Sequence, residues 1–316
     1  MVFTAIILSD KHKHAEDNDY HTYKTVSCTP ATIKKTGKMV KKCSGCSKEL
    51  SYTIPMIKSV KLDKTSFDCT GKSIKPFATV KDSKGKELIY GADYTITCKS
   101  NIKPGTGTVT VNFKGKYSGT VSKTFKIVLG KPNGFTVSER KTDSLSLAWY
   151  PVEGATQYYL YVYSKKKDKY VLLKKTKNTD FEYENLTPGK TYKFRVKAVR
   201  KNKGKTYSSS YVYLKTATKP QKVSLDTLKS KKKRQVVVTW KTVSGTTGYE
   251  VKYSTSKKFT KKTTSTVTVK KEETKKTTLK KLISGKKYYV KVRAYKTVDG
   301  KKIYGAYSSV KTVKVK

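Results

Sequence analysis

The residues best suited to metal binding or bond-forming chemistry are all confined to the first third of the chain. They are the three histidines and five cysteines, namely His12, His14, His21, Cys28, Cys43, Cys46, Cys69 and Cys98. Residues 99–316 contain neither residue type. Catalysis of the Ser-His-Asp or Cys-His kind and histidine-bound metals are therefore excluded from the last two thirds of the sequence.

Four of these residues are spaced as ligands for a metal ion. Cys43 and Cys46 form a C-x-x-C knuckle, and His21 and Cys28 precede it. Thiolate sulfur and imidazole nitrogen are the ligands that tetrahedral Zn²⁺ prefers. The spacing predicts a structural zinc held by His21, Cys28, Cys43 and Cys46. The alternative is a disulfide, either Cys43–Cys46 or one that contains Cys28.

Carboxylate pairs are the remaining candidates for catalysis. Glu182 with Glu184 and Glu272 with Glu273 are close neighbours along the chain. Glycoside hydrolysis needs two carboxylates that face each other across a cleft, about 5 to 9.5 Å apart, and neighbours on one strand or loop do not make a cleft. The sequence also lacks a Gly-rich phosphate loop, H-E-x-x-H and G-x-S-x-G. We therefore predict that the chain is not an enzyme.

Composition and turn spacing indicate an all-β fold for the 316 residues. The chain is rich in Val, Thr and Tyr, and Gly, Pro, Asn and Asp interrupt it every ~8 to 12 residues. No apolar run reaches the ~18 residues that a membrane span needs. Residues 2–8 are apolar but lack the flanks of a signal peptide, so we expect a fragment of a longer protein or a mis-set start. The alternatives are the remnant of a leader or a strand.

The last part of the chain is a duplication. Trp149 recurs as Trp240, 91 residues on (240 − 149), and Tyr192 recurs as Tyr288, 96 residues on (288 − 192). Around them, residues 154–158 match 245–249, and residues 186–192 match 282–288. This period is too long for a solenoid and fits tandem β-sandwiches.

Strict alternation of apolar and charged residues predicts a half-buried strand in each copy. The inward set of the first copy is Tyr192, Phe194, Val196 and Ala198, and the outward set is Lys193, Arg195 and Lys197. The inward set of the second copy is Tyr288, Val290, Val292 and Ala294. The Leu-x-x-Gly-x-x-Tyr spacing predicts a tyrosine corner in each copy, in which the hydroxyl of Tyr192 or Tyr288 bonds the backbone a few residues upstream.

These landmarks give the duplicated part a family resemblance. An early-strand Trp, a Gly-x-x-x-Tyr entry and the Leu-x-x-Gly-x-x-Tyr motif occur twice, so residues 130–218 and 219–316 resemble fibronectin type III modules. The resemblance implies two tandem β-sandwiches with scaffold rather than catalytic roles.

The preceding part resembles other modules of Gram-positive secreted and surface proteins. Residues 80–86, 93–96 and 113–121 are similar to a bacterial Ig-like module, expected over 54–129. Residues 21–53 resemble a zinc-ribbon-like element, although Thr32 stands where such elements commonly have a third cysteine. Residues 1–20 are expected to be a flexible segment.

Two further cysteines take their interpretation from the Ig-like resemblance. Cys69 and Cys98 hold positions that are often aromatic in that module. The resemblance therefore implies a cross-strand disulfide between them, which an extracellular compartment permits. The alternative is a pair of buried free thiols.

A second alternating segment predicts a contact face. Tyr159, Tyr161 and Tyr163 point outward from their strand. In the resembled fold, this strand neighbours the one that carries Lys193, Arg195 and Lys197. Rings beside cations suit stacking on sugars, and the alternative is a cross-strand ladder that only stiffens the sheet.

Net charge completes the functional prediction. The formal charge is +49, and only five of the basic residues are arginine. Such a field attracts polyanions, whereas scattered arginines give no specific nucleic-acid readout. We predict a monomeric, extracellular, non-catalytic spacer and adhesion region whose partners are anionic wall polymer or glycan, or other surface proteins. The alternative is a carbohydrate-binding accessory region of a secreted polysaccharide-degrading enzyme.

Overall fold

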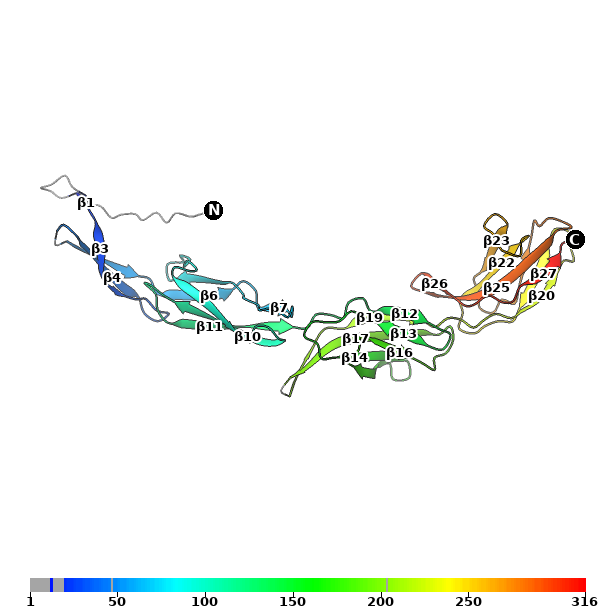
Figure 1. Cartoon of the computed structure of the whole chain (residues 1–316), viewed down its shortest axis with the longest axis horizontal. Coiled ribbons are helices and arrows are strands. Elements are labelled where there is room, and N and C mark those ends of the chain that lie inside the picture. Colours follow the sequence, from blue (N-terminus) through cyan, green and yellow to red (C-terminus); the bar gives the residue numbers. More distant parts are fainter. Residues whose placement is uncertain (1–11, 14–19, 47, 203) are drawn as a thin grey trace. The chain divides into compact units, whose positions relative to one another are not determined.

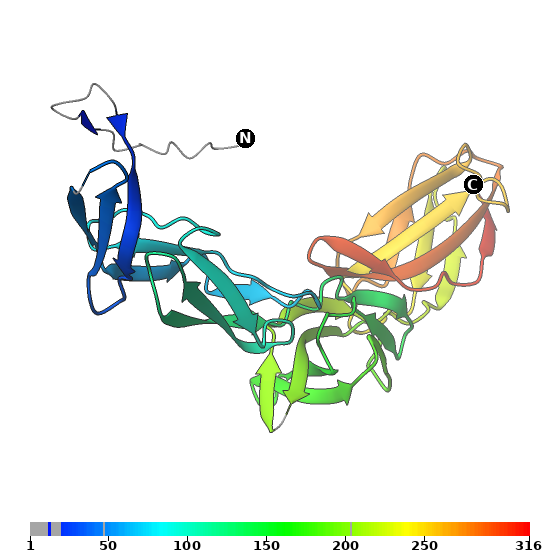
Figure 2. The same cartoon turned by 60° about the vertical axis from the view of Figure 1, so that its left-hand side comes forward.

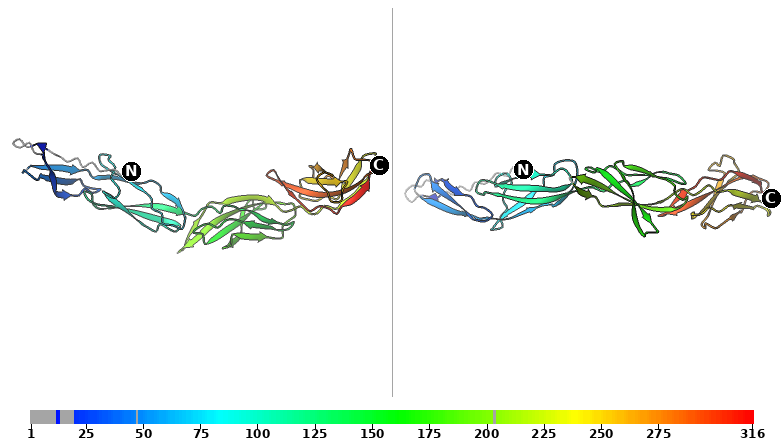
Figure 3. Two further views of the ribbon diagram at one scale, coloured as in Figure 1. Left: turned by 45° about the horizontal axis from the view of Figure 1, so that its top comes forward. Right: turned by 90° about the horizontal axis from the view of Figure 1, so that it is seen from below.

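The computed structural model describes residues 12–13, 20–46, 48–202 and 204–316, and these residues form strands and loops without a helix (Figure 1). Two further views likewise show strands joined by loops, without a coiled ribbon among the described residues (Figure 3). Because no helix occurs in these ranges, none is long and apolar enough to span a membrane. The chain divides into two compact units, Met1–Leu129 and Gly130–Lys316.

Unit 1 contains several small sheets, coloured from blue through cyan to teal in Figure 2. One pairs β3 (Tyr23–Thr29), β4 (Gly37–Cys43) and β5 (Glu49–Ile54). A second pairs β6 (Ile57–Leu62) with β8 (Ala78–Asp82). A third has the order β7 (Ser66–Asp68), β11 (Thr120–Val128), β10 (Gly105–Phe113) and β9 (Tyr94–Lys99), with β7 parallel to β11. The short strands β1 (His12–Lys13) and β2 (Tyr20–His21) pair with each other.

The cysteine- and histidine-containing segment shares its core with the sandwich that follows. Ala31 is fully buried in one apolar cluster with Ile54, Val80 and Val111. Its backbone N–H donates to Lys116 O at 2.9 Å, and its carbonyl accepts from Ser118 N at 2.9 Å. Residues 21–53 are therefore joined to the sandwich by packing as well as by sequence.

Unit 2 contains two sandwich modules with the same strand order. In the first module, one sheet pairs β12 (Thr136–Arg140), β13 (Leu145–Ala148) and β16 (Asp180–Tyr183). The facing sheet has the order β15 (Lys169–Thr176), β14 (Gln157–Ser164), β17 (Thr191–Asn202) and β18 (Lys205–Ser208), and β19 (Val212–Ala217) also pairs with β17.

The second module repeats this arrangement. Its smaller sheet pairs β20 (Leu225–Lys229), β21 (Val236–Trp240) and β24 (Lys276–Leu279). Its larger sheet has the order β23 (Thr264–Val269), β22 (Gly248–Ser254), β25 (Lys287–Val298) and β26 (Lys301–Tyr304), with β27 (Lys311–Lys314) on β25. The sequence duplication is thus a duplication of topology.

A tryptophan lies in the core of each module. Trp149 is 3% exposed, and its ring meets that of Tyr158 at 5.5 Å. Trp240 is 1% exposed, and its ring meets that of Tyr249 at 5.3 Å. Aromatic pairs of this kind add about 0.5 to 1.5 kcal/mol beyond the apolar area that they bury.

The predicted tyrosine corners are confirmed in both modules. The Thr187 N–H donates to Tyr192 Oη at 2.9 Å, and the Ile283 N–H donates to Tyr288 Oη at 3.3 Å. The glycine of each Leu-x-x-Gly-x-x-Tyr motif has a positive φ, 67° at Gly189 and 77° at Gly285. Glycine adopts this left-handed conformation at little cost, which explains its place in the motif.

Candidate ligand-contact face

Alternation along β14 separates a packed face from an outer face. Tyr158 and Leu160 are buried in the core, whereas Tyr159, Tyr161 and Tyr163 are half-buried on the other side. The strand therefore presents three rings at every second position, as a pleated strand must.

The register of β14 with β17 brings cations to these rings. Tyr159 lies opposite Lys197, and Tyr161 lies opposite Arg195. The Lys197 ammonium is 5.8 Å from the centre of the Tyr159 ring. Farther along, the Lys193 ammonium is 5.2 Å from the centre of the Tyr163 ring. The structure thus brings together all six residues that the sequence places on this face.

Three further tyrosines complete the face, and the alternation along β14 and β17 did not indicate them. Arg195 lies over three rings, with its Cζ 5.0 Å from Tyr161, 4.6 Å from Tyr170 and 4.0 Å from Tyr211. The Tyr213 ring packs edge to face against the Tyr170 ring and at a tilted angle against the Tyr211 ring. We call the whole set the tyrosine–lysine face. Its members are Tyr159, Tyr161, Tyr163, Tyr170, Tyr211, Tyr213, Lys193, Arg195, Lys197 and Lys175, whose ammonium lies 5.3 Å from the centre of the Tyr159 ring.

The electrostatics of the face are those of neutral rings beside positive charges. Burial and a hydrogen bond with Tyr211 raise the pKa of Tyr161 to about 12, so its hydroxyl stays protonated at physiological pH. Within the described ranges, neither Lys193, Arg195 nor Lys197 is in an ion pair. Each cation–π contact contributes about 0.5 to 1 kcal/mol at an exposed site. The face can therefore attract an anion and offer flat rings to a sugar.

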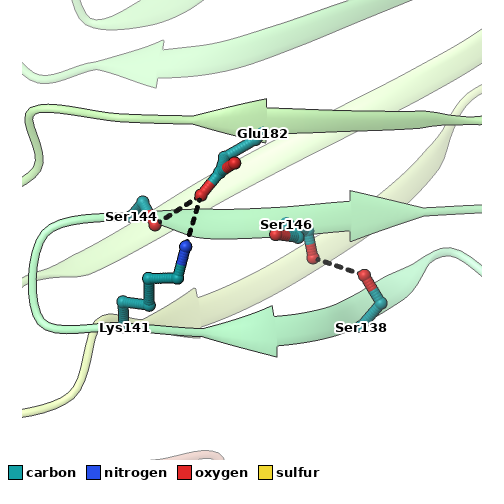
Figure 4. Close-up of polar contacts among 5 residues, drawn as sticks. All are labelled: Ser138, Lys141, Ser144, Ser146 and Glu182. Atoms are coloured by element: carbon teal, nitrogen blue, oxygen red, sulfur yellow. Dashed lines mark hydrogen bonds and ion pairs between the residues drawn. The ribbon is translucent and has the colours of Figure 1, made fainter.

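One carboxylate of each sequence pair is held by local hydrogen bonds. Glu182 on β16 accepts from the Ser144 hydroxyl at 2.8 Å and from the Lys141 ammonium at 3.2 Å (Figure 4). The bond from Ser144, and then that from Lys141, lowers the pKa of Glu182 below its ordinary value. Glu272 accepts from the Gly245 N–H at 2.8 Å. Both carboxylates thus have structural partners.

The proposed zinc ligands are only partly brought together. Burial acts to raise the pKa of the Cys43 thiol, but hydrogen bonds from Gly45 and Cys46 outweigh it, so the pKa lies below its ordinary value. A lowered thiol pKa favours the thiolate that zinc requires. This part of the knuckle therefore fits a metal ligand.

Cys28 does not fit the same site. Cys28 lies opposite Met39 of β4. Met39 is four residues before Cys43, a distance of about 13 Å along a strand. In the described part of the chain, no three His, Cys, Asp or Glu side chains gather to hold a metal ion. The side chains of His12, His14 and His21 lie outside the described set. Zinc binding stays a prediction that metal analysis of protein purified under reducing conditions tests.

Cys69 and Cys98 are free thiols that pack against the same apolar cluster. The Cys69 thiol donates to the Ile102 carbonyl at 3.5 Å, and burial raises the pKa of Cys98. No disulfide joins them in this structure, and the bridge remains a prediction for the oxidised protein.

Thiol labelling distinguishes the environments of these cysteines. We expect Cys28, which is exposed, to react with a thiol reagent at neutral pH about a hundredfold faster than Cys69, because Cys69 is buried and must await local opening. Cys98 is half-buried and its raised pKa lowers its thiolate fraction, so it should also react more slowly than Cys28. Mass spectrometry of the labelled peptides measures the rates. A second count on unfolded, unreduced protein tests the bridge: two thiols missing at these positions would establish it, and both present would exclude it.

Comparison with known proteins identifies the modules of unit 2. The fibronectin type III domain model matches residues 130–213 and 218–307, more than half of the chain. The chain therefore belongs to the fibronectin type III family. No match was found among curated proteins.

Several solved structures are similar to the chain. A two-domain fibronectin type III segment of chicken tenascin is 22% identical, and the alignment covers 59% of this chain and 100% of that chain, with a TM-score of 0.37. The FN1-FN3 domains of chicken CNTN1 are 14% identical, with 83% and 99% covered and a TM-score of 0.35. FN3tt is 28% identical, with 29% and 95% covered and a TM-score of 0.25.

Proposed function

We propose that the chain is a non-catalytic, extracellular spacer and adhesion region of a bacterial surface or secreted protein. Fibronectin type III modules typically act as scaffolds outside the cell, and two of them stand in series here. The Ig-like and zinc-ribbon-like resemblances of residues 21–129 support a bacterial surface context. In this function, the modules hold a partner domain at a distance.

Adhesion rests on the charge of the chain and on the tyrosine–lysine face. With a formal charge of +49, the surface attracts anionic wall polymer or anionic glycan by many weak contacts, which salt screens. The observation that carries the proposal is that Lys193, Arg195 and Lys197 lie among tyrosine rings without a described carboxylate partner. A polymer that brings acidic groups and sugar rings would complement this face.

A salt titration with two matched triple variants tests the proposal. We expect the chain to bind an immobilised acidic polysaccharide at low salt and to lose affinity steeply by a few hundred millimolar salt. Replacing Lys193, Arg195 and Lys197 by Gln should weaken binding about tenfold or more. The control replaces the loop lysines Lys231, Lys232 and Lys233 by Gln, which removes the same charge elsewhere. Equal losses in both variants would contradict a role for the face.

The alternative function is a carbohydrate-binding accessory region of a secreted polysaccharide-degrading enzyme. The rings of Tyr159, Tyr161 and Tyr163 favour it, because stacking on a sugar does not need charge. Binding to a neutral polysaccharide that survives about 0.5 M salt would support this alternative over charge-driven adhesion.

A further inference from the structure

The tyrosine–lysine face of the first module has a counterpart in the second. Lys197 and Tyr211 recur as Arg293 and Tyr307, both 96 residues on (293 − 197; 307 − 211). The cation lies near the tyrosine ring in each copy, at 5.3 Å for Lys197 and 4.5 Å for Arg293. The neighbouring cation does so too, since Arg195 is 4.0 Å from the Tyr211 ring and Lys291 is 4.4 Å from the Tyr307 ring.

One exchange distinguishes the two copies. Tyr159 of the first module corresponds to Glu250 of the second, because residues 154–158 match 245–249. Each faces the equivalent cation across the strand pair, Tyr159 opposite Lys197 and Glu250 opposite Arg293. The second module therefore carries its own carboxylate where the first carries a ring.

Glu250 shows how this arrangement holds a carboxylate. Its Oε1 lies 2.7 Å from Arg293 Nη2 and 2.8 Å from Arg293 Nε, and it accepts from the Tyr307 hydroxyl at 2.7 Å. The Glu250 side chain is 9% exposed. A carboxylate is thus bound by one cation and one tyrosine hydroxyl within the protein itself.

We propose that the first module binds the carboxylates of an acidic polysaccharide, rich in uronic acid, in the way that the second module binds Glu250. This inference rests on the proposed adhesive function and assigns it to one module and one class of polymer. Lys197 and Tyr211 receive the ligand's carboxylate, as their counterparts Arg293 and Tyr307 receive Glu250. In the second module, Glu250 already neutralises Arg293, so that module contributes little to polymer binding.

The rings select a sugar over other polyanions. Tyr159, Tyr161 and Tyr163 follow one another at every second position of β14, so they offer aromatic surface along the strand beside the cations. The apolar faces of pyranose rings stack on such surfaces, whereas a polyphosphate chain has no face to stack. Asp168, at the β14–β15 turn, accepts from the Tyr163 hydroxyl at one end of this set. Lys197 and Arg195 have no such partner in the described ranges.

Introducing the missing carboxylate tests the inference. We expect Tyr159→Glu to weaken binding of polygalacturonate by about tenfold at about 150 mM salt, because the new carboxylate pairs with Lys197 in the ligand's place. Tyr159→Gln introduces a side chain of the same size as glutamate but without its charge. Its affinity for polygalacturonate should fall about threefold through the loss of the ring alone. Thr136→Glu, on an exposed position of β12 in the opposite sheet, makes the same charge change and should lose less than twofold. Calorimetry or affinity electrophoresis measures all four chains.

The outcomes separate this inference from the proposed function. Similar losses in Tyr159→Glu and Thr136→Glu would overturn the inference and leave charge-driven adhesion standing. Binding of polyphosphate as tight as that of polygalacturonate would also overturn it, since the rings would then select nothing. Failure of the wild-type chain to bind any polyanion would contradict both the inference and the proposed adhesive function. Should Tyr159→Glu melt early, Lys197→Gln gives the same test by removing the cation, and a loss below twofold there would count against the inference.

Discussion

Replacing Trp240 by alanine is expected to destabilise the second module by about 3 to 5 kcal/mol, the usual cost of removing a buried aromatic side chain. Trp240 is 1% exposed and packs within a cluster that includes Val238, Tyr249 and Val292. Among the described residues its Nε1 finds no hydrogen-bond partner, so its contribution comes from packing. A domain with a typical stability of about 5 to 15 kcal/mol would be brought close to its unfolding threshold.

The distribution of tryptophan makes the measurement selective. The chain has two tryptophans, Trp149 in the first module and Trp240 in the second. In Trp240→Ala, fluorescence therefore reports the first module alone, while hydrogen exchange of β21, β22 and β25 reports the second. Trp240→Phe keeps a ring in the core and should cost less than half as much. If hydrogen exchange shows that Trp240→Ala lowers the unfolding free energy of the second module by less than about 1 kcal/mol, the core must close around the cavity.

The strands of the repeated modules could be predicted because their signals are local. Along β17, Tyr192, Phe194 and Val196 alternate with cations, and this pattern needs no knowledge of the partner strand. The same alternation along β14 places Tyr159 and Tyr161 on the outer face. Their meeting with Lys197 and Arg195 followed from the strand order that the family resemblance implied, and the register agrees.

The rest of the face depends on contacts between residues far apart in the chain. Tyr170 and Tyr211 reach Arg195 only because β15 and β19 flank β14 and β17 in the sheet. A usable signal existed in the repeat, since Tyr211 recurs as Tyr307 at the same interval as Tyr192 and Tyr288. In unit 1, the burial of Ala31 in one cluster with Val111 of a later sheet had no sequence signal, because alanine is common both inside and outside cores.

Glu250 illustrates a polar position whose burial the pattern could not predict. Alternation along β22 places it on the outer face with Lys252, where a solvated side chain is the ordinary expectation. Arg293 and Tyr307 cover it instead, and Tyr307 follows β26, more than fifty residues later in the chain. Local periodicity reports which side of a strand a residue occupies, and it says nothing of what long-range packing lays over that side.

Replacing Glu250 by alanine is expected to cost about 3 to 5 kcal/mol, because Arg293 would be left without its partner in a largely buried place. Lys252 and Lys291 lie beside the same Tyr307 ring, so three cations would then face one another. Glu250→Gln keeps an acceptor without the charge and should cost about half as much. Glu273→Ala, at an exposed carboxylate of the same module, is the control and should change stability by less than about 0.5 kcal/mol. Urea unfolding at pH 7 measures each free energy.

The pH dependence of the unfolding free energy tests whether the ionised carboxylate of Glu250 causes this stabilisation. Burial acts to raise the pKa of Glu250, but the hydrogen bond from Tyr307 and the charge of Arg293 outweigh it, so the pKa is lowered in the folded protein. A lowered pKa means that the stabilisation is fully present above the unfolded value of about 4.3 and is lost as pH falls through the folded value. The difference in unfolding free energy between the wild-type chain and Glu250→Gln should therefore be constant from pH 7 to about pH 5 and shrink below pH 4. A difference that stayed unchanged down to pH 2 would mean that the charge of Glu250 contributes nothing and that shape alone is responsible.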